Sequence, residues 1–387
     1  MRALLSALRS PVQLLAAAYG FLALAHETVA WQSGLVTKVV GAALVVAVAL
    51  RIWSDGPAER GGFWVLAVPV AGLAGWSALS LLWSVDPGAT RVRALHLGFE
   101  AVLLGALCLA PRREVVVRGL AIGLLGGAVV LALGFVSALG EATGARLYAF
   151  GVHPNLQARD LALGVLAGGL LLVPDHRRLL GAVAMAGFGL GLSNSSGAWL
   201  ATVAAGVVLI LDRSHRHLVA ALLVGVLLGS GALAWAGSAA DSRLRSPATA
   251  LRGSAVEEIG SGRLVLWGHA ARMSARNPVL GVGAGAFPAA MEEVRAAYQH
   301  AGGEHSKPRR RSHSVYLDLL AETGPLGLLL FLIPLGWAAR VAIRERAVAA
   351  GALTAFVATS VATDSLLHQK SLWLALALAI LLARPAR

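Results

Sequence analysis

His313 is the residue whose type and position are best suited to proton transfer. It follows the arginines at 309–311, and Ser312 or Ser314 is a suitable N-cap for a helix that Gly324 and Pro325 should end. The positive end of that helix and the arginines both favour an uncharged imidazole, which can accept a proton. A base of this kind activates a sugar or serine hydroxyl. The alternative interpretation is an ordinary cap or interfacial histidine.

A second candidate group lies about 50 residues earlier. Arg263 and Trp267 share one face of a predicted amphipathic helix at 262–270, which places an aromatic ring at headgroup level and an arginine toward a phosphate. A plain interfacial anchor explains the same pattern. The glycine-rich segment 277–287 lacks the preceding strand and the following acidic residue of a dinucleotide-binding fold.

These candidates belong to a long hydrophilic stretch, 238–312, with eleven basic and six acidic residues. Such a surface favours an anionic lipid, a phosphate or a diphosphate as ligand, and a solvated basic face is the alternative. We expect no nucleic-acid partner, because the stretch is predicted to lie outside the membrane. No histidine, cysteine or carboxylate spacing indicates a metal site.

The composition indicates the elements that must position these groups. Of 387 residues, 57% are hydrophobic and 14% charged, and the mean hydropathy is +0.72. Soluble domains carry about 25% charge, so a soluble, disordered or disulfide-rich protein is excluded. The single cysteine, Cys108, cannot form an internal disulfide.

Apolar runs predict an all-α polytopic membrane protein of about twelve transmembrane helices. Merging the two short runs between 161 and 193 would give eleven. We expect one integrated domain, with helices 1–9 in residues 1–237, a large, partly helical periplasmic loop at 238–312, and helices 10–12 in 313–387. The runs lie at 12–25, 34–50, 63–83, 94–110, 115–139, 161–174, 179–193, 197–211, 217–236, 324–339, 347–363 and 371–383.

The distribution of Lys and Arg predicts the orientation. With the N-terminus inside, the inner segments hold sixteen, the outer short loops hold six and the long stretch holds eleven. Positive charge is retained on the cytoplasmic side, so both termini are expected there and the long loop in the periplasm. A cleaved signal peptide ending near 23–25 is the alternative for the first run.

Several motifs and their order are characteristic of one family. They are Gly-Arg-x-x-x-Trp at 262–267, Asn-Pro-x-x-Gly-x-Gly-x-Gly-x-Phe at 277–287 and His-Ser-x-Tyr-Leu-x-x-Leu-x-Glu-x-Gly at 313–324. Segments 82–87 and 195–200 add to the pattern. Together they resemble the O-antigen ligase and O-antigen polymerase superfamily of bacterial envelopes.

The resemblance implies an inverting glycosyltransferase of the inner membrane that needs no metal, cofactor or nucleotide sugar. Its donor would be a glycan on undecaprenyl diphosphate, and its acceptor hydroxyl most naturally the lipid A core of lipopolysaccharide. Arg263 would bind the diphosphate and His313 would activate or position the acceptor, with Trp267, Tyr316 and Glu322 supporting them.

One position departs from the family pattern. Family members usually carry an arginine where this chain has Ser196, so a second diphosphate ligand is missing. Arg159, or one of Arg309, Arg310 and Arg311, is the candidate replacement; a snorkelling interfacial arginine is the alternative for Arg159.

Other polar residues are weaker candidates. Glu100 lies within a predicted span, where an ionisable residue suggests either function or helix pairing. His153 and Asn155 are expected in an outer loop near the lipid entrance, or in a simple Asn-capped turn. A small polar turn with Asp364, His368 and Lys370 is expected to be solvated.

Several alternative functions stay open at this point. The acceptor could be a growing glycan or a protein serine or threonine, which would make the protein a polymerase or an O-oligosaccharyltransferase. A different class, a transporter or flippase for an envelope lipid, is disfavoured because no internal repeat is present and the notable basic residues gather at one face. A membrane scaffold would not require His313.

Overall fold

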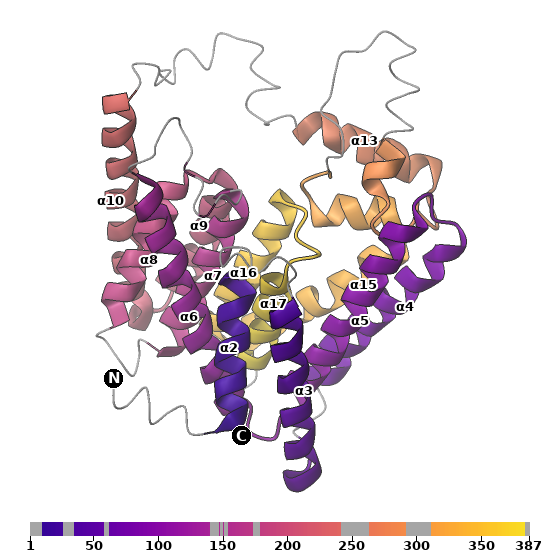
Figure 1. The fold of residues 1–387 in the computed structure, drawn as a ribbon, viewed down its shortest axis with the longest axis horizontal. Helices are drawn as coiled ribbons and strands as arrows, with labels where there is room; N and C mark the ends of the chain where they lie inside the picture. Colours follow the sequence, from indigo (N-terminus) through magenta and orange to yellow (C-terminus); the bar gives the residue numbers. More distant parts are fainter. Residues whose placement is uncertain are drawn as a thin grey trace.

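The computed structural model is built from helices throughout the part of the chain that it describes (Figure 1). That part comprises residues 10–25, 35–57, 62–139, 147, 150, 154–172, 179–240, 263–291 and 311–383. The elements are α2 (Pro11–Ala25), α3 (Leu35–Asp55), η1 (Phe63–Ala67), α4 (Val68–Leu79), η2 (Ser80–Leu82), α5 (Pro87–Leu109), α6 (Arg113–Ala138), α7 (Pro154–Leu172), α8 (Leu180–Ser193), α9 (Ser196–Ile210), η6 (Arg213–His215), α10 (Arg216–Ala240), α13 (Arg263–Arg276), α15 (Val315–Arg344), α16 (Val348–Thr363) and α17 (Lys370–Leu382).

Over its described residues, each of the twelve predicted apolar runs coincides closely with one helix, except that the run 63–83 coincides with the consecutive elements η1, α4 and η2. Within the described residues, six helical segments are long and apolar enough to cross a membrane, and five more helices are apolar but shorter. Helices α7 and α8 are separate, so merging the runs between 161 and 193 is wrong. The architecture is that of a polytopic membrane protein, and the number of spans stays a prediction.

The core of the helix bundle forms around α17. Nearly every residue of α17 is buried, and Trp373 is its largest side chain. Figure 1 shows α16 and α17 in the middle of the bundle, between the α6–α10 group on the left and α4, α5 and α15 on the right. Close packing depends on small residues: a Cβ on Gly123 of α6 would lie 1.9 Å from the carbonyl oxygen of Ala17 in α2. Such approaches are typical of helices associating in lipid, where packing replaces hydrophobic driving force.

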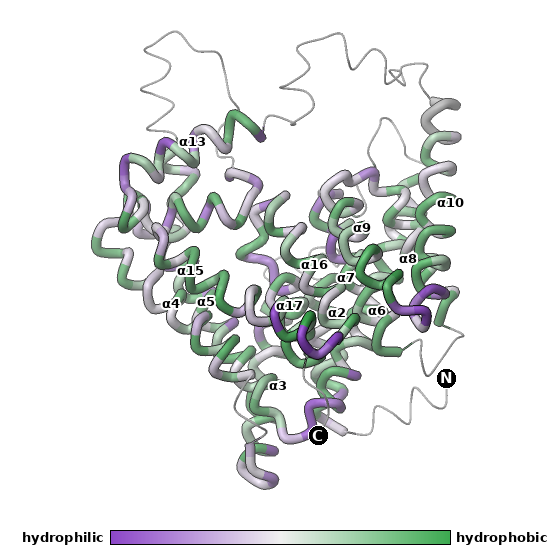
Figure 2. The backbone as a smooth tube through the Cα atoms, turned by 180° about the vertical axis from the view of Figure 1, so that it is seen from behind, coloured by the Kyte–Doolittle hydropathy of each residue, from purple (hydrophilic) through white to green (hydrophobic). Residues whose placement is uncertain are grey.

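Charged residues separate to the two ends of α3 and α5. Arg51 and Arg112, which the orientation with the N-terminus inside places on the inner side, line one cavity at the C-terminal ends of these helices. Lys38 and Arg93, both predicted on the outer side, lie near the N-terminal ends of the same helices. Figure 2 shows hydrophobic backbone along most of the bundle helices, with hydrophilic stretches at their ends and on α13. This grouping agrees with the predicted sorting, while the side that faces the cytoplasm stays a prediction.

A small outer layer covers one end of the bundle. Helix α13 and the segment 277–291 pack onto the first turns of α15 and share an apolar core with Leu266, Phe287 and Ala321 (Figure 1). The predicted helix end at Gly324 and Pro325 is confirmed, because α15 has a kink at Gly324 (φ 67°, ψ −170°). The outer layer therefore rests on a short helix, 315–323, that is set at an angle to the following span.

Candidate active site

His313 is held in an uncommon backbone conformation. Its φ is +55°, a left-handed value that few residues other than glycine adopt. Ser312 on one side donates from its backbone N–H (3.1 Å) and hydroxyl (2.6 Å) to the same oxygen of Asp318, and the Ser312 hydroxyl accepts from the N–H of Ser314. The N–H of His313 itself donates to the hydroxyl of Ser365 at 3.1 Å. These bonds fix where the imidazole points and offset the strain of the backbone.

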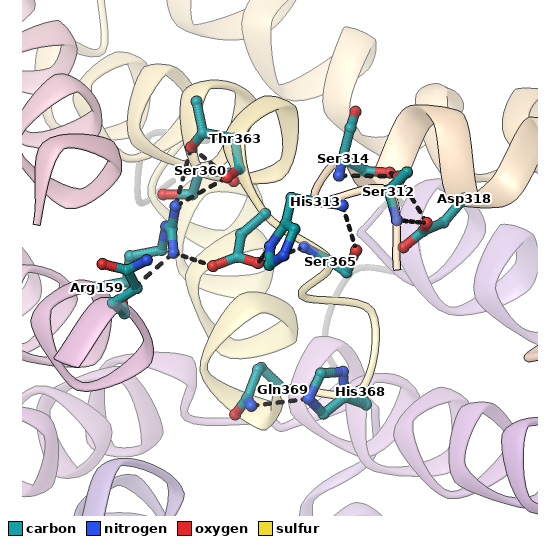
Figure 3. Close-up of polar contacts among 12 residues, drawn as sticks. Arg159, Ser312, His313, Ser314, Asp318, Ser360, Thr363, Ser365, His368 and Gln369 are labelled. Carbon is teal, nitrogen blue, oxygen red and sulfur yellow. Dashed lines mark hydrogen bonds and ion pairs between the residues drawn. The ribbon is translucent and has the colours of Figure 1, made fainter. Parts of the chain in front are cut away.

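Asp364 lies between His313 and Arg159. The Nδ1 of His313 is 3.0 Å from Oδ1 of Asp364, and the guanidinium of Arg159 donates to the other carboxylate oxygen (Figure 3). Asp364 and Arg159 are almost fully buried, while 37% of the His313 side chain is exposed. Three segments distant in sequence, α7, the start of α15 and the α16–α17 loop, therefore meet at one charged cluster.

The charge of Asp364 is stabilised inside this cluster. Burial alone would raise the pKa of the carboxyl, but the hydrogen bond with His313 and the positive charge of Arg159 hold that pKa well below its usual range. The expectation that Asp364, His368 and Lys370 form a solvated turn is wrong for Asp364 and Lys370, whose side chains are buried, while His368 is exposed. A carboxylate bonded to Nδ1 keeps the proton there and leaves Nε2 as the acceptor, which is the arrangement of a general base with its orienting group.

Arg159 takes up space that a glycine leaves beside Ser196. A Cβ on Gly197 would lie 2.4 Å from Nη2 of Arg159, so the guanidinium reaches the start of α9. Its Nη2 donates to the carbonyl and hydroxyl oxygens of Thr363 at 3.2 and 3.1 Å. Arg159 thus places a guanidinium next to the position where Ser196 departs from the family pattern. Ser196 itself is exposed in the first turn of α9.

The glycine-rich segment is joined to the His313 helix by backbone pairing. The N–H groups of Val282 and Gly283 donate to the carbonyls of Ala321 and Glu322, both at 2.9 Å. The carboxylate of Glu322 accepts from the N–H of Gly285 at 2.8 Å and from that of Phe287 at 3.3 Å. Glu322 therefore positions the glycine-rich segment.

The segment at 82–87 belongs to the same assembly. The N–H of Val85 donates to the carbonyl of Val282, and the indole of Trp83 donates to the carbonyl of Leu280 at 3.2 Å. Gly283, at φ +109°, leaves no room for a Cβ, which would lie 2.2 Å from Oγ of Ser84. The motifs at 82–87, 277–287 and 313–324 are thus distant in sequence but form one contact surface.

The remaining predicted residues are placed less centrally. Arg263 begins α13, is half-buried, and lies close enough for its charge to act on Arg159. Trp267 is 37% exposed on the same helix. The hydroxyl of Tyr316 donates to the carbonyl of Ala358 at 3.3 Å, which ties α15 to α16.

The arginines next to His313 are only partly described. Arg311 lies 3.4 Å from Glu322, so it neutralises that buried carboxylate. Arg309, Arg310 and His153 lie outside the described residues. Asn155 uses its backbone carbonyl to accept from Arg159.

Glu100 is buried within α5, and neither of its oxygens has a hydrogen-bond partner among the described residues. The ring of His96, one turn earlier, is 3.9 Å away. Its charge also interacts with Tyr19 of α2 and with Lys370 of α17, so described residues of two other helices lie near it, as the helix pairing considered from sequence requires.

A comparison with protein families bears on the possible classes. Residues 180–332 match the family model described as O-antigen ligase. This match confirms the resemblance to the O-antigen ligase and polymerase superfamily. No curated protein matches the chain.

The O-antigen ligase match covers about two fifths of the chain, from α8 to the middle of α15. It includes His313, Arg263 and Ser196, whereas Arg159 and Asp364 lie outside it. The family supports a glycosyltransferase-like membrane enzyme of the O-antigen ligase or polymerase type, with lipid-linked glycan substrates. Sequence reasoning missed Asp364 as a partner of His313, because a short polar turn between two spans looks the same whether it is exposed or buried.

Proposed function

We propose that this protein transfers a glycan from undecaprenyl diphosphate to an acceptor hydroxyl at the periplasmic face of the bacterial inner membrane. The observation that carries the proposal is the bond between Nδ1 of His313 and the buried carboxylate of Asp364. It leaves Nε2 of a partly exposed histidine free to take a proton. The family match at 180–332 supports the class of reaction.

The reaction needs one base and one site of anion stabilisation. The acceptor oxygen attacks the anomeric carbon of the donor sugar on the face opposite to the diphosphate, and its proton passes to Nε2 of His313. The new C–O bond forms while the bond from the anomeric carbon to the diphosphate oxygen breaks, so the lipid diphosphate leaves with the electron pair and the anomeric configuration inverts. Asp364 stabilises the imidazolium that results, and a proton later leaves to solvent.

Arginine is well suited to stabilise the anionic leaving group. Charge grows on the diphosphate as it leaves, and a permanently charged, bidentate side chain stabilises it more in the transition state than in the ground state. Arg263 is our candidate, together with the arginines at 309–311. Arg159 was also a candidate ligand, but its guanidinium already bonds Asp364 and Thr363, so we assign it a positioning role.

The proposed chemistry does not by itself identify the acceptor. The lipid A core is preferred, and a growing glycan or a protein serine or threonine uses the same base and leaving group. Acceptor choice depends on the surface around α13 and not on the phosphate ligands. The assay must therefore offer more than one acceptor.

The test is glycan transfer in membranes from a strain that lacks its own ligase, with lipid-diphosphate-linked glycan as donor. Wild type is compared with His313→Ala and Arg263→Ala at matched expression. His217→Ala is the control, since His217 is exposed in the first turn of α10. We expect glycan on the lipid A core with wild type and control, and at least a ~100-fold loss with His313→Ala, the usual contribution of a general base.

Other outcomes separate the parts of the proposal. If the product is instead a longer glycan on the lipid carrier, the proposed chemistry stands and the protein is a polymerase. Full transfer by His313→Ala would remove the proposed base. Translocation of lipid-linked glycan without any transfer would favour the transporter.

A further inference from the structure

A basic cavity lies beside the candidate active site and is not explained by it. Its volume is about 650 Å³, which is within the range of small-molecule binding sites. It is bounded by α3, the first turns of α5, Gly285, Arg311 and the turn that leads into α17. The side chains in its lining that can donate hydrogen bonds are Lys38, Arg93, His96, Arg311, His368 and Lys370.

The lining is unbalanced in charge. Four of its side chains are permanently cationic, and none of its described lining residues is acidic. A concave site lined by one sign of charge concentrates ions of the opposite sign. The cavity therefore suits an anion with more than one negative charge.

Arg93 gives this cavity the features of a built site. The residue is 6% exposed, and its Nη1 has no hydrogen-bond partner among the described residues. Glu322 and Asp318 attract it electrostatically, but oxygens of these carboxylates already accept from backbone N–H groups. A buried guanidinium nitrogen without an acceptor is costly, so an anion in the cavity would satisfy it.

The N-terminal ends of two helices add to the positive electrostatic potential of the cavity. Gly88 and Ala89 in the lining belong to the first turn of α5, and Lys370 is the first residue of α17. The N-terminal ends of helices carry partial positive charge and favour phosphate groups. Both ends therefore act in the same direction as the basic side chains.

The rest of the cavity is apolar and continues onto the outer surface of the bundle. Val92, Leu95 and Phe99 line it, and Val92 and Leu95 are 66% and 69% exposed. On the neighbouring helix α3, Val39 and Val46 are each 58% exposed. A ligand with an anionic head and a long apolar chain would satisfy both parts.

We propose that this cavity binds the diphosphate of a membrane-embedded isoprenoid lipid through Arg93 and Lys38, with its hydrocarbon chain along α3 and α5. Assigning that lipid as the glycan donor rests on the proposed function, whereas binding is measurable without any transfer. The cavity shares Arg311 and the α16–α17 turn with the surroundings of His313 (Figure 3 shows His368 and Gln369 on that turn). A diphosphate held here would thus lie next to the proposed base.

The test measures binding of farnesyl diphosphate to the purified protein in phosphatidylcholine nanodiscs by calorimetry. Arg93→Gln removes the buried cation, and Arg91→Gln is the matched control on the same helix, exposed and outside the cavity. We expect Arg93→Gln to weaken binding about tenfold or more, as befits a charge-assisted contact, and Arg91→Gln to leave it unchanged. Lys38→Gln, at an exposed position that does not threaten folding, should weaken binding severalfold.

Two further probes distinguish the source of the anion. Farnesol and inorganic diphosphate should each bind more weakly than farnesyl diphosphate. Equal binding of inorganic diphosphate would overturn the lipid assignment, and equal binding of farnesol would overturn the anion site. Unchanged affinity in both Arg93→Gln and Lys38→Gln would also overturn it. Intact binding together with a wild type that transfers nothing would instead refute the proposed function and leave the cavity as a lipid site.

Discussion

Replacing Asp364 by Asn tests whether the carboxylate orients the proposed base. The carboxylate accepts from the N–H of Ser365 at 2.9 Å and is 3.0 Å from Nδ1 of His313 on one oxygen, and accepts from Arg159 on the other. An amide has one acceptor and one donor end. Whichever way the side-chain amide turned in Asp364→Asn, its NH2 group would face Arg159, or else Nδ1 and the Ser365 N–H.

Each orientation has a cost that follows from the geometry. With the NH2 group toward His313, the ring is driven to the tautomer that carries its proton on Nε2, so it cannot accept one from the acceptor hydroxyl. With the NH2 group toward Arg159, a buried guanidinium loses its counter-ion. We expect the transfer rate to fall by about 10²–10⁴-fold, the span of general-base catalysis, or about 3–5 kcal/mol of barrier.

The assay is transfer at saturating donor, with kcat and KM determined separately and the folded fraction measured by size-exclusion chromatography. The reduction should be in kcat, because the carboxylate acts on the base and not on the substrates. Asp55→Asn is the matched control, since Asp55 is exposed at the far end of α3. Asp364→Asn that is folded and keeps more than about a tenth of the wild-type rate would refute the orienting role.

The loss of stability caused by Asp364→Asn should depend on pH. The pKa of Asp364 is held well below its usual range in the folded protein, so its contribution to stability is fully present above the unfolded value of about 3.9. That contribution is lost as the pH falls through the folded pKa. The thermal midpoints of wild type and Asp364→Asn in detergent should therefore differ at pH 7 and converge in strong acid; a constant difference would contradict the assignment.

Three further substitutions test the surroundings. Arg159→Gln leaves Asp364 buried without its cation, and should lower stability by about 3 kcal/mol or more, while the double variant with Asp364→Asn should lose less than the sum of the single losses in thermal unfolding. Gly283→Ala should lower folded yield, since its Cβ would lie 2.2 Å from a neighbouring hydroxyl oxygen at φ +109°, whereas Gly206→Ala, in open space on α9, should not. Glu322→Gln weakens the hydrogen bonds that the N–H groups of Gly285 and Phe287 donate to this carboxylate. It should therefore lower the protease resistance of the outer layer more than it lowers kcat for transfer.

Local sequence signals predicted the helices well because their cause is local. A run of apolar residues must form a helix in lipid to satisfy its backbone, so hydropathy alone located the helices over the described residues of the twelve runs. Gly324 and Pro325 likewise ended the His313 helix as predicted, since one permits a positive φ and the other cannot continue the preceding hydrogen bonds. The order of the motifs along the chain can also be read from the sequence, but the contacts between them cannot.

The contacts that define the site were not predictable for a physical reason. Asp364 and Arg159 are 205 residues apart, and only the packing of α7 against α16 and α17 removes both from water. A polar turn has the same composition whether it is solvated or buried, so its sequence carries no sign of that partner.

Arg93 is different, because a signal for it was present in the sequence. Arg93, His96 and Glu100 follow at i, i+3 and i+7, the spacing of one helical face, and α5 begins early enough at Pro87 to include them. The apolar run at 94–110 begins one residue after Arg93, so hydropathy leaves this residue outside the predicted helix although α5 includes it. Three ionisable residues along one stripe of a membrane helix indicate a polar path into the bundle. The basic cavity at the outer end of that stripe is where such a path would begin, and binding of farnesyl diphosphate to Arg93→Gln decides whether a lipid head occupies it.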